Sequence, residues 1–347
     1  MPEITGSLAV ALVIIVALNA YALLAGADFG GGVWDLLATG PRREQQRRLI
    51  AEAIGPVWEA NHVWLILVVV LLFTCFPAAF ALLAIRLHIP LSLMLIGIVL
   101  RGSAFIFRSY DSKRDAVQRR WGSVFAVASL ITPLLLGTMI GTVASGRLLR
   151  YGDGTEGFLR AFVTPWLTPF ALAVGVFALC LFAFLAAVYL TVEARERALR
   201  EDYRHRALGA GVAVFVAAVG ALLLSSHDEA GAPLMWHGLV HSGWALLLHA
   251  ATGVAAVTAL GALWWRSYYL ARVAAAAQVS LILWGWAVAQ FPYLVPPDLT
   301  VTSAAAPAVT LRLTLIILAI GAVFFLPSLF YLFRVFKTGR PGPVSDH

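Results

Sequence analysis

The sequence predicts an all-α, polytopic membrane protein with about nine transmembrane helices, arranged as two four-helix bundles and one peripheral helix. Three observations support this fold class. Of the 347 residues, 61% are hydrophobic and only 12% are charged, whereas soluble domains are about one quarter charged. Apolar runs of the length that crosses a bilayer, about 20 residues, recur along the chain. Most of the charged residues fall in the short segments between these runs.

The apolar runs give the predicted elements in chain order. Residues 1–145 form a first four-helix bundle with spans at 7–27, 57–76, 79–107 and 122–145. Residues 146–291 form a second, with spans at 164–191, 207–226, 242–264 and 273–291. Residues 292–347 hold an external loop, a ninth helix at 310–333 and a cytoplasmic tail. Four prolines in 291–309 exclude a regular helix there, because proline lacks the backbone N–H that a helix needs.

The basic residues predict the orientation of these spans. Nineteen of the 25 Lys and Arg residues lie in the tail or in connections on one side of the predicted membrane, and three lie on the other. Short cytoplasmic loops carry such an excess of positive charge. The amino terminus is therefore expected outside and the carboxyl terminus in the cytoplasm. The net charge of +7 is explained by the basic residues of these short loops, which set the orientation in the lipid bilayer. It requires no nucleic-acid partner.

Three charged residues in the first three spans are the strongest candidates for function. Asp28 closes the first predicted span, Glu59 opens the second and Arg101 lies in the third. Charges within a bilayer are costly, so they usually face the interior of a bundle and pair with one another. All three are expected at the cytoplasmic ends of adjoining helices. They are interpreted as a proton relay, with a structural ion pair between helices as the alternative.

His62 and the triple glycine lie next to these charges. His62 is three residues after Glu59, so the two share a helix face, with Trp58 beside them. A Glu-x-x-His unit also occurs in di-metal bundles, but those need a second copy, which this sequence lacks. No metal site is predicted. Gly30-Gly31-Gly32 is expected to form a tight turn out of the first helix, with close helix packing.

Three segments of the first bundle resemble subunit II of the cytochrome bd-type quinol oxidases. They are GADFGGGVW at 26–34, GPVWEANHVWLI at 55–66 and RGSAFIFR at 101–108. The length, the span count and the orientation agree with the same family. Beyond about residue 150, the general layout alone supports the resemblance.

The resemblance implies a complex in the bacterial cytoplasmic (inner) membrane that oxidises a membrane quinol and reduces dioxygen to water. Haems b and d would be bound by the partner, the haem-bearing subunit I, and this chain would ligate no cofactor. It would stabilise subunit I and line a proton pathway from the cytoplasm to the oxygen-reducing site. A structural quinone or lipid in this subunit, and small accessory subunits of the complex, are left open.

The resemblance also carries roles to single residues. Asp28, Glu59 and Arg101 would form the proton pathway or control it electrostatically. The residues that shape the pathway would be Trp58, Asn61, Trp64, Ser103 and Arg108.

The sequence departs from the family pattern at three positions. The family more often has Asp-Gly-Asn where this chain has Glu59-Ala60-Asn61, and Gln or Glu where it has His62. Ala25 replaces an acidic residue that many members carry. One carboxylate is therefore missing and an imidazole is added, which makes His62 a further candidate for the relay.

Two other functions compete with the oxidase subunit. A stand-alone secondary transporter would use Glu59 and Arg101 for coupling, but such proteins usually have repeated halves and broken helices near the midplane. A self-contained b-type cytochrome would use His237, His241 or His249, which are spaced for ligation. These histidines are expected near the external boundary, where water can solvate them.

Overall fold

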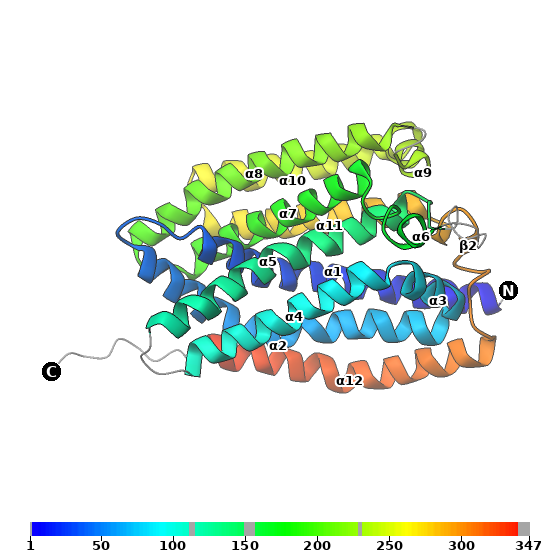
Figure 1. The fold of residues 1–347 in the computed structure, drawn as a ribbon, viewed down its shortest axis with the longest axis horizontal. Helices are drawn as coiled ribbons and strands as arrows, with labels where there is room; N and C mark the ends of the chain where they lie inside the picture. The colour runs from blue at the N-terminus through cyan, green and yellow to red at the C-terminus, as the bar shows by residue number, and fades with distance from the viewer. Residues whose placement is uncertain (1, 111–114, 149–156, 228–230, 339–347) are drawn as a thin grey trace.

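The computed structural model describes residues 2–110, 115–148, 157–227 and 231–338, without the side chains of residues 2–3, 54–60, 108–110, 115–119, 333 and 335–338. Long helices lie side by side in an elongated bundle (Figure 1). The helices are α1 (Pro2–Leu36), α2 (Arg43–Cys75), α3 (Pro77–Arg86), α4 (His88–Tyr110), α5 (Asp115–Ala144), α6 (Phe158–Phe162), α7 (Pro169–Glu193), α8 (Arg197–Ser225), α9 (Pro233–Trp236), the π-helix η1 (His237–His241), α10 (Ala245–Trp264), α11 (Tyr268–Gln290) and α12 (Ala308–Thr338). Two short strands, β1 (Tyr293–Val295) and β2 (Leu299–Thr300), pair antiparallel.

The number of helices that can cross a membrane agrees with the predicted fold class. Within the described residues, eight helices are long and apolar enough to span a bilayer. The apolar end of α2 and the short α3, bent by 117° to each other, supply a ninth candidate. The chain is therefore an all-α polytopic membrane protein.

The long helices form one continuous bundle, in which α1, α2, α4 and α5 are called the first group and α7, α8, α10 and α11 the second. In the first group α1 packs on α2 and α5, and α5 packs on α4. In the second group α7 packs on α8 and α11, and α10 packs on both of these. The groups meet where α7 lies against α1 and α5, and α12 packs on α1 and α2 with its apolar stretch exposed. The proposed unit boundaries, 1–145, 146–291 and 292–347, stay a prediction.

The predicted third span, 79–107, is wrong as a single helix. The chain forms α3, breaks at Leu87 and continues as α4 from His88. Pro77 occupies the first turn of α3, where its missing N–H is tolerated. Pro90 cannot continue a helix from α3, because its ring would clash with the carbonyl of Arg86 four residues earlier.

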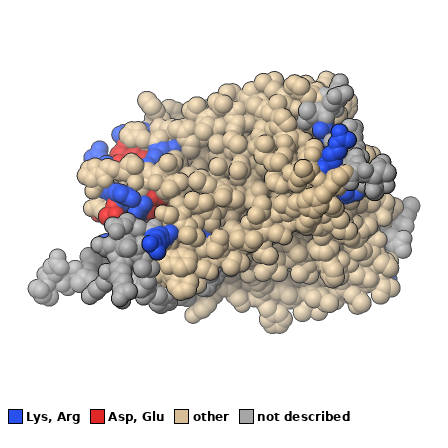
Figure 2. Space-filling view, viewed as in Figure 1, with Lys and Arg blue, Asp and Glu red and all other residues tan. Residues whose placement is uncertain are grey.

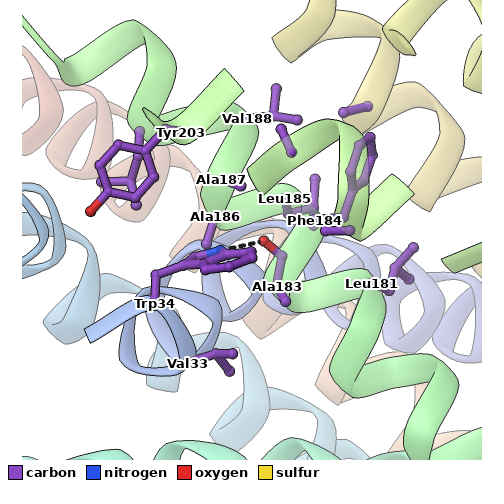
Figure 3. Close-up of a cluster of buried hydrophobic side chains, with 14 of the residues drawn as sticks. Val33, Trp34, Leu181, Ala183, Phe184, Leu185, Ala186, Ala187, Val188 and Tyr203 are labelled. Atoms are coloured by element: carbon purple, nitrogen blue, oxygen red, sulfur yellow. Dashed lines mark hydrogen bonds between the residues drawn. The ribbon is translucent and has the colours of Figure 1, made fainter. Parts of the chain in front are cut away.

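The triple glycine does not form the predicted turn, because α1 continues through it to Leu36. The expected close packing is present. A Cβ at Gly30 would overlap the backbone carbonyl of Phe182 on α7, and a Cβ at Gly32 would overlap the side chain of Ser129 on α5. Directly after the glycines, Trp34 is buried and its indole N–H donates to the carbonyl oxygen of Ala183, 2.7 Å away (Figure 3).

The charged side chains visible in Figure 2 gather toward the two ends of the bundle and leave an uncharged band between them. Most lie at one end, where both signs occur. In the described chain, α1 begins at the opposite end and α12 ends near the highly charged one (Figure 1). The proline-rich 291–309 segment contains β1 and β2, which were not predicted, and no long helix. The N–H of Ala306 ties it to the carbonyl of Cys75 at the end of α2, 2.8 Å away.

Candidate functional site

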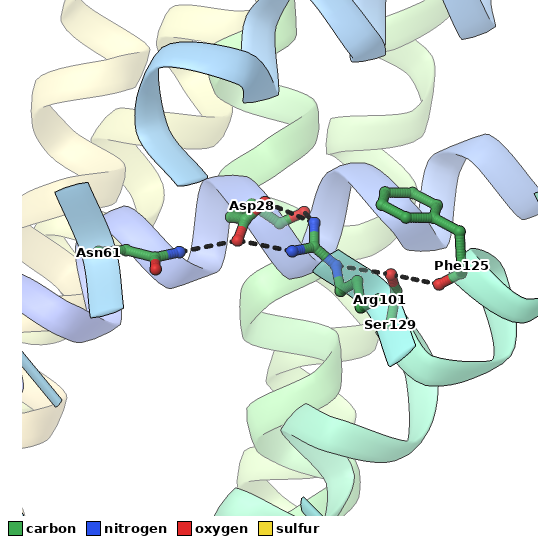
Figure 4. Close-up of polar contacts among 5 residues, drawn as sticks. All are labelled: Asp28, Asn61, Arg101, Phe125 and Ser129. Carbon is green, nitrogen blue, oxygen red and sulfur yellow. Dashed lines mark hydrogen bonds and ion pairs between the residues drawn. The ribbon is translucent and has the colours of Figure 1, made fainter. Parts of the chain in front are cut away.

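Asp28 on α1 and Arg101 on α4 form a buried ion pair inside the first helix group (Figure 4). Their side chains are 0% and 2% exposed. Two guanidinium nitrogens each donate to one carboxylate oxygen, over 2.7 Å and 2.5 Å. Arg101 Nη2 also donates to the backbone carbonyl of Asp28, 2.8 Å away. This two-pronged geometry is the strongest form of a carboxylate–arginine contact.

Two further helices complete the hydrogen bonding of the pair. Asn61 on α2 donates from Nδ2 to Asp28 Oδ2 over 2.7 Å. On α5, Ser129 Oγ accepts from Arg101 Nε over 2.9 Å and donates to the carbonyl of Phe125 over 2.7 Å. The site therefore joins four helices, α1, α2, α4 and α5, through one charged pair.

Two aromatic rings enclose the guanidinium group. The Cζ atom of Arg101 lies 4.8 Å from the ring centroid of Phe29 and 4.8 Å from that of Phe125. A cation over an aromatic face is attracted by the ring's quadrupole, and the attraction grows when water is excluded. The rings thus stabilise the charge of Arg101 where bulk water does not reach it.

The structure brings together Asp28 and Arg101, as the sequence predicted, and adds Asn61 as a direct partner of the carboxylate. The side chains of Glu59, Trp58 and Arg108 lie outside the described residues, so their predicted roles are untested.

The remaining predicted residues surround the pair less directly. His62 is half-buried on α2. Trp64 is half-buried and packs edge-on against Phe325 of α12, with ring centroids 5.6 Å apart. Ser103 is half-buried two residues after Arg101, and residues at that spacing do not share a helix face. Ser103 therefore does not join the ion pair.

Several buried polar atoms near the pair lack a hydrogen-bond partner among the described residues. Within the described part of the chain, the Tyr21 hydroxyl, Asn61 Oδ1, Trp64 Nε1 and Thr132 Oγ1 are buried without a hydrogen-bond partner. Tyr21 and Trp64 belong to or pack on one apolar cluster together with Phe29. Buried polar groups of this kind are usually satisfied by ordered water. Asn61 and Trp64 were among the predicted pathway-shaping residues, whereas Tyr21 and Thr132 were not predicted, because a single tyrosine or threonine in an apolar span gives no signal in the sequence.

Asp35 is a second buried carboxylate that was not predicted. Its side chain is 2% exposed, and Arg47 Nε on α2 lies 3.8 Å from its Oδ1. Asp35 follows Asp28 by two helical turns, so both lie on similar faces of α1, about 10 Å apart along the axis. The predicted end of the first span at residue 27 hid this relationship, because it placed Asp35 in a loop.

The histidines of the cytochrome alternative do not form a shared site. The rings of His237 and His241 are exposed and stacked face to face, with centroids 5.5 Å apart, which leaves no room for a porphyrin between them. His249 Nδ1 makes a hydrogen bond with the carbonyl of Ala245 in its own helix. Among the described residues, no group of three or more His, Cys, Asp or Glu side chains could hold a metal ion.

Comparison with known proteins shows which family the chain resembles. A protein of Bacillus subtilis (strain 168) named as a cytochrome bd menaquinol oxidase subunit II is 25% identical over 330 residues, which are 92% of each chain. Subunit 2 of the cytochrome bd-I ubiquinol oxidase of Escherichia coli (strain K12) is 27% identical over 183 residues, 52% of this chain and 46% of that one.

The fold and the family model lead to the same assignment. A chain in the structure of bd oxidase from Geobacillus thermodenitrificans matches with a TM-score of 0.78 over 97% of this chain and 100% of that chain, at 19% identity. The family model described as cytochrome bd terminal oxidase subunit II matches residues 7–336. The chain belongs to the family of cytochrome bd terminal oxidase subunit II.

Proposed function

We propose that this chain is the non-haem subunit of a bd-type quinol:oxygen oxidoreductase of the bacterial cytoplasmic membrane. It stabilises the haem-bearing subunit I and lines a proton pathway from the cytoplasm toward the oxygen-reducing site. The names of the relatives support quinol as the substrate class, since they include menaquinol and ubiquinol oxidases. The observation that carries the proposal is the fully buried Asp28–Arg101 pair at the junction of four helices.

The carboxylates of α1 suggest the course of the pathway. The end of the bundle that carries most of the charge is cytoplasmic by the distribution of basic residues. Asp35 lies nearer that end, beside Arg47, and Asp28 follows two turns deeper on a similar face. Protons would therefore enter near Asp35 and pass by Asp28.

Beyond Asp28, the groups without partners supply the next donors and acceptors. The amide of Asn61 contacts the carboxylate with Nδ2 and leaves Oδ1 unpaired among the described residues. Tyr21, Trp64 and Thr132 offer further unpaired polar atoms to water in the same helix group. A chain of water held by such atoms can conduct protons where lone apolar side chains cannot. Glu59 and His62, predicted from the sequence, would extend this chain from α2.

Arg101 would control the pathway electrostatically. Its guanidinium group is permanently charged and contacts both oxygens and the backbone carbonyl of Asp28. These contacts hold the carboxylate in one orientation. The positive charge of Arg101 opposes a second cation at the same place. A proton would thus pass along the water beside the pair, with Asp28 and Arg101 setting the local field.

The haems are proposed to belong to subunit I. The stacked and exposed His237 and His241, and the helix-bonded His249, support this placement, because they present no pair of axial ligands. The chemistry that the haems supply is electron transfer from quinol to dioxygen, while this chain would hold and move protons.

Purification from membranes tests the proposed function. A tag on this chain is expected to bring down a haem-bearing partner in equal amount, and the purified complex should consume oxygen with a quinol. A colourless protein purified alone would favour the transporter. A haem spectrum from this chain alone would favour the self-contained cytochrome. Either result would overturn the proposal.

A further inference from the structure

Two histidines on the π-helix η1 form an exposed pair that the proposed proton pathway does not use. His237 and His241 are the first and last residues of η1, and both side chains are exposed. Their ring planes lie within 14° of parallel, and the ring centroids are 5.5 Å apart. π-Helices are rare and occur frequently at functional sites. The pair is therefore a candidate binding site separate from the Asp28–Arg101 pair.

The packing of η1 explains why both rings face solvent. Gly238, directly after His237, is buried, and a Cβ there would lie 2.9 Å from the Cβ of Ala289 on α11. One side of η1 is thus packed closely against α11. A π-helix bonds residue i to residue i+5, so four residues are slightly less than one turn. His237 and His241 therefore project together from the side that is left to solvent.

The spacing of the pair is that of a helical metal-binding motif. Two histidines four residues apart on one helix face bind Zn²⁺ in the H-E-x-x-H motif, where the Glu is the general base of a metalloprotease. The segment here is His237-Gly-Leu-Val-His241, which keeps both ligands and has Gly238 at the position of that Glu. The pattern predicts metal binding and gives no support to a hydrolytic reaction.

The separation of the two rings suits one metal ion. Two imidazoles on one tetrahedral Zn²⁺ have ring centroids about 5 Å apart, given Zn–N bonds of about 2.0–2.1 Å. The observed 5.5 Å is close to this value. Both rings are exposed, so each can turn about its Cβ–Cγ bond and aim a nitrogen at a shared ion. A single ion is far smaller than a porphyrin, so it fits where a haem does not.

We propose that His237 and His241 chelate one divalent transition-metal ion of the Zn²⁺ class, with water in the other coordination positions. Imidazole is a preferred ligand of such ions. Two protein ligands leave an open and exchangeable site, in agreement with the lack of any group of three or more ligands among the described residues. The helix α9, directly before η1, lies at the end of the bundle where α1 begins (Figure 1). That end is expected outside the cytoplasm, so the ion would come from the outer solution.

Binding of Zn²⁺ to the complete complex tests this site. The complex is purified with a tag that contains no histidine and stripped with a chelator, and equilibrium dialysis against radioactive zinc gives the number of ions and their affinity. His237→Ala and His241→Ala should each weaken the binding of one ion by about tenfold or more, because even the loss of an outer-shell partner of a metal ligand costs about 10–100-fold. The matched control is His88→Ala, which removes an exposed histidine that has no second histidine within four residues. It should bind as the wild type does.

Three results would overturn the proposal. Wild-type affinity in both variants of the pair would show that these histidines hold no ion. Weakening in one variant alone would show a single ligand in place of a chelate. Equal weakening by His88→Ala would show scattered binding to exposed histidines.

Chemical modification of the wild-type complex provides a second measurement that needs no variant. Diethyl pyrocarbonate modifies accessible imidazole nitrogens, and mass spectrometry measures the rate at each histidine. Zn²⁺ should slow the modification of His237 and His241 and leave that of His88 unchanged. Modification of the pair at the same rate with and without Zn²⁺ would contradict the site.

Discussion

Asp28 and Arg101, 73 residues apart in the sequence, form a two-pronged ion pair that is closed to solvent on every side. Asn61 and Ser129 bind its two ends, so helices α1, α2, α4 and α5 depend on one another through it. Its geometry explains why two charges persist in the interior of a mainly apolar bundle. The predictions below separate its structural contribution from its proposed part in proton transfer.

Asp28→Asn should destabilise the complex strongly. The substitution leaves the Arg101 charge buried without its counter-ion, and breaking a buried pair on one side costs about 3–5 kcal/mol. Thermal unfolding of the purified complex and its yield in membranes would measure the loss. A variant with the stability of the wild type would show that water or another carboxylate compensates Arg101.

Ser129→Ala should have a smaller effect, because it removes one acceptor from Arg101 and leaves the ion pair intact. The expected loss is about 1–3 kcal/mol, the cost of an unsatisfied buried donor. Thr142→Ala on the same helix is the matched control, since its buried hydroxyl donates to the carbonyl of Thr138 one turn earlier and does not contact Arg101. If both variants unfold at the same temperature, Ser129 does not support Arg101.

Gly30→Ala should separate α1 from α7. Its Cβ would overlap the carbonyl of Phe182, which is backbone and cannot rotate away. Overpacking of this kind costs about 1–3 kcal/mol, and more where backbone must shift. Gly220→Ala on α8 is the control, because its Cβ would meet nothing within 4 Å. Thermal unfolding of both variants measures the difference. An unchanged Gly30→Ala protein would contradict the close approach of the two helices.

Joint replacement of His237, His241 and His249 by Ala should leave the haem spectrum of the complex unchanged. The first two rings stack on each other at the surface, and the third bonds within its own helix. The absorbance of the reduced complex, normalised to protein, provides the measurement. Loss of a haem band would place a cofactor in this chain.

The sequence predicted the helices and the charged pair well because both follow from simple energetic rules. Apolar runs must cross the bilayer, and charges within them must find partners. Asp28 and Arg101 were thus expected to meet. The contact from Asn61 was not resolved beyond a general shaping role, since an amide in a span has many satisfactory orientations.

Tertiary packing determined what the sequence did not predict. The run Gly30–Gly32 was expected to form a turn, yet the helix continues because α7 and α5 pack directly against it. That extension makes Asp35 a buried residue of α1. The break at Leu87 was missed because the apolar stretches on both sides of Arg86, His88 and Pro90 were interpreted as one continuous span. The predicted role of Glu59 stays a prediction.

Quinol-driven oxygen consumption by the neutral pair Asp28→Asn with Arg101→Gln tests the central claim most directly. Removing both charges avoids the unpaired cation, so the complex should assemble with normal haem content. Its turnover per haem should nevertheless fall by about tenfold or more, because proton transfer through the pair's surroundings is impaired. A fully assembled neutral pair that consumes oxygen at the wild-type rate would contradict a role in the proton pathway and leave Asp28 and Arg101 with a structural role alone.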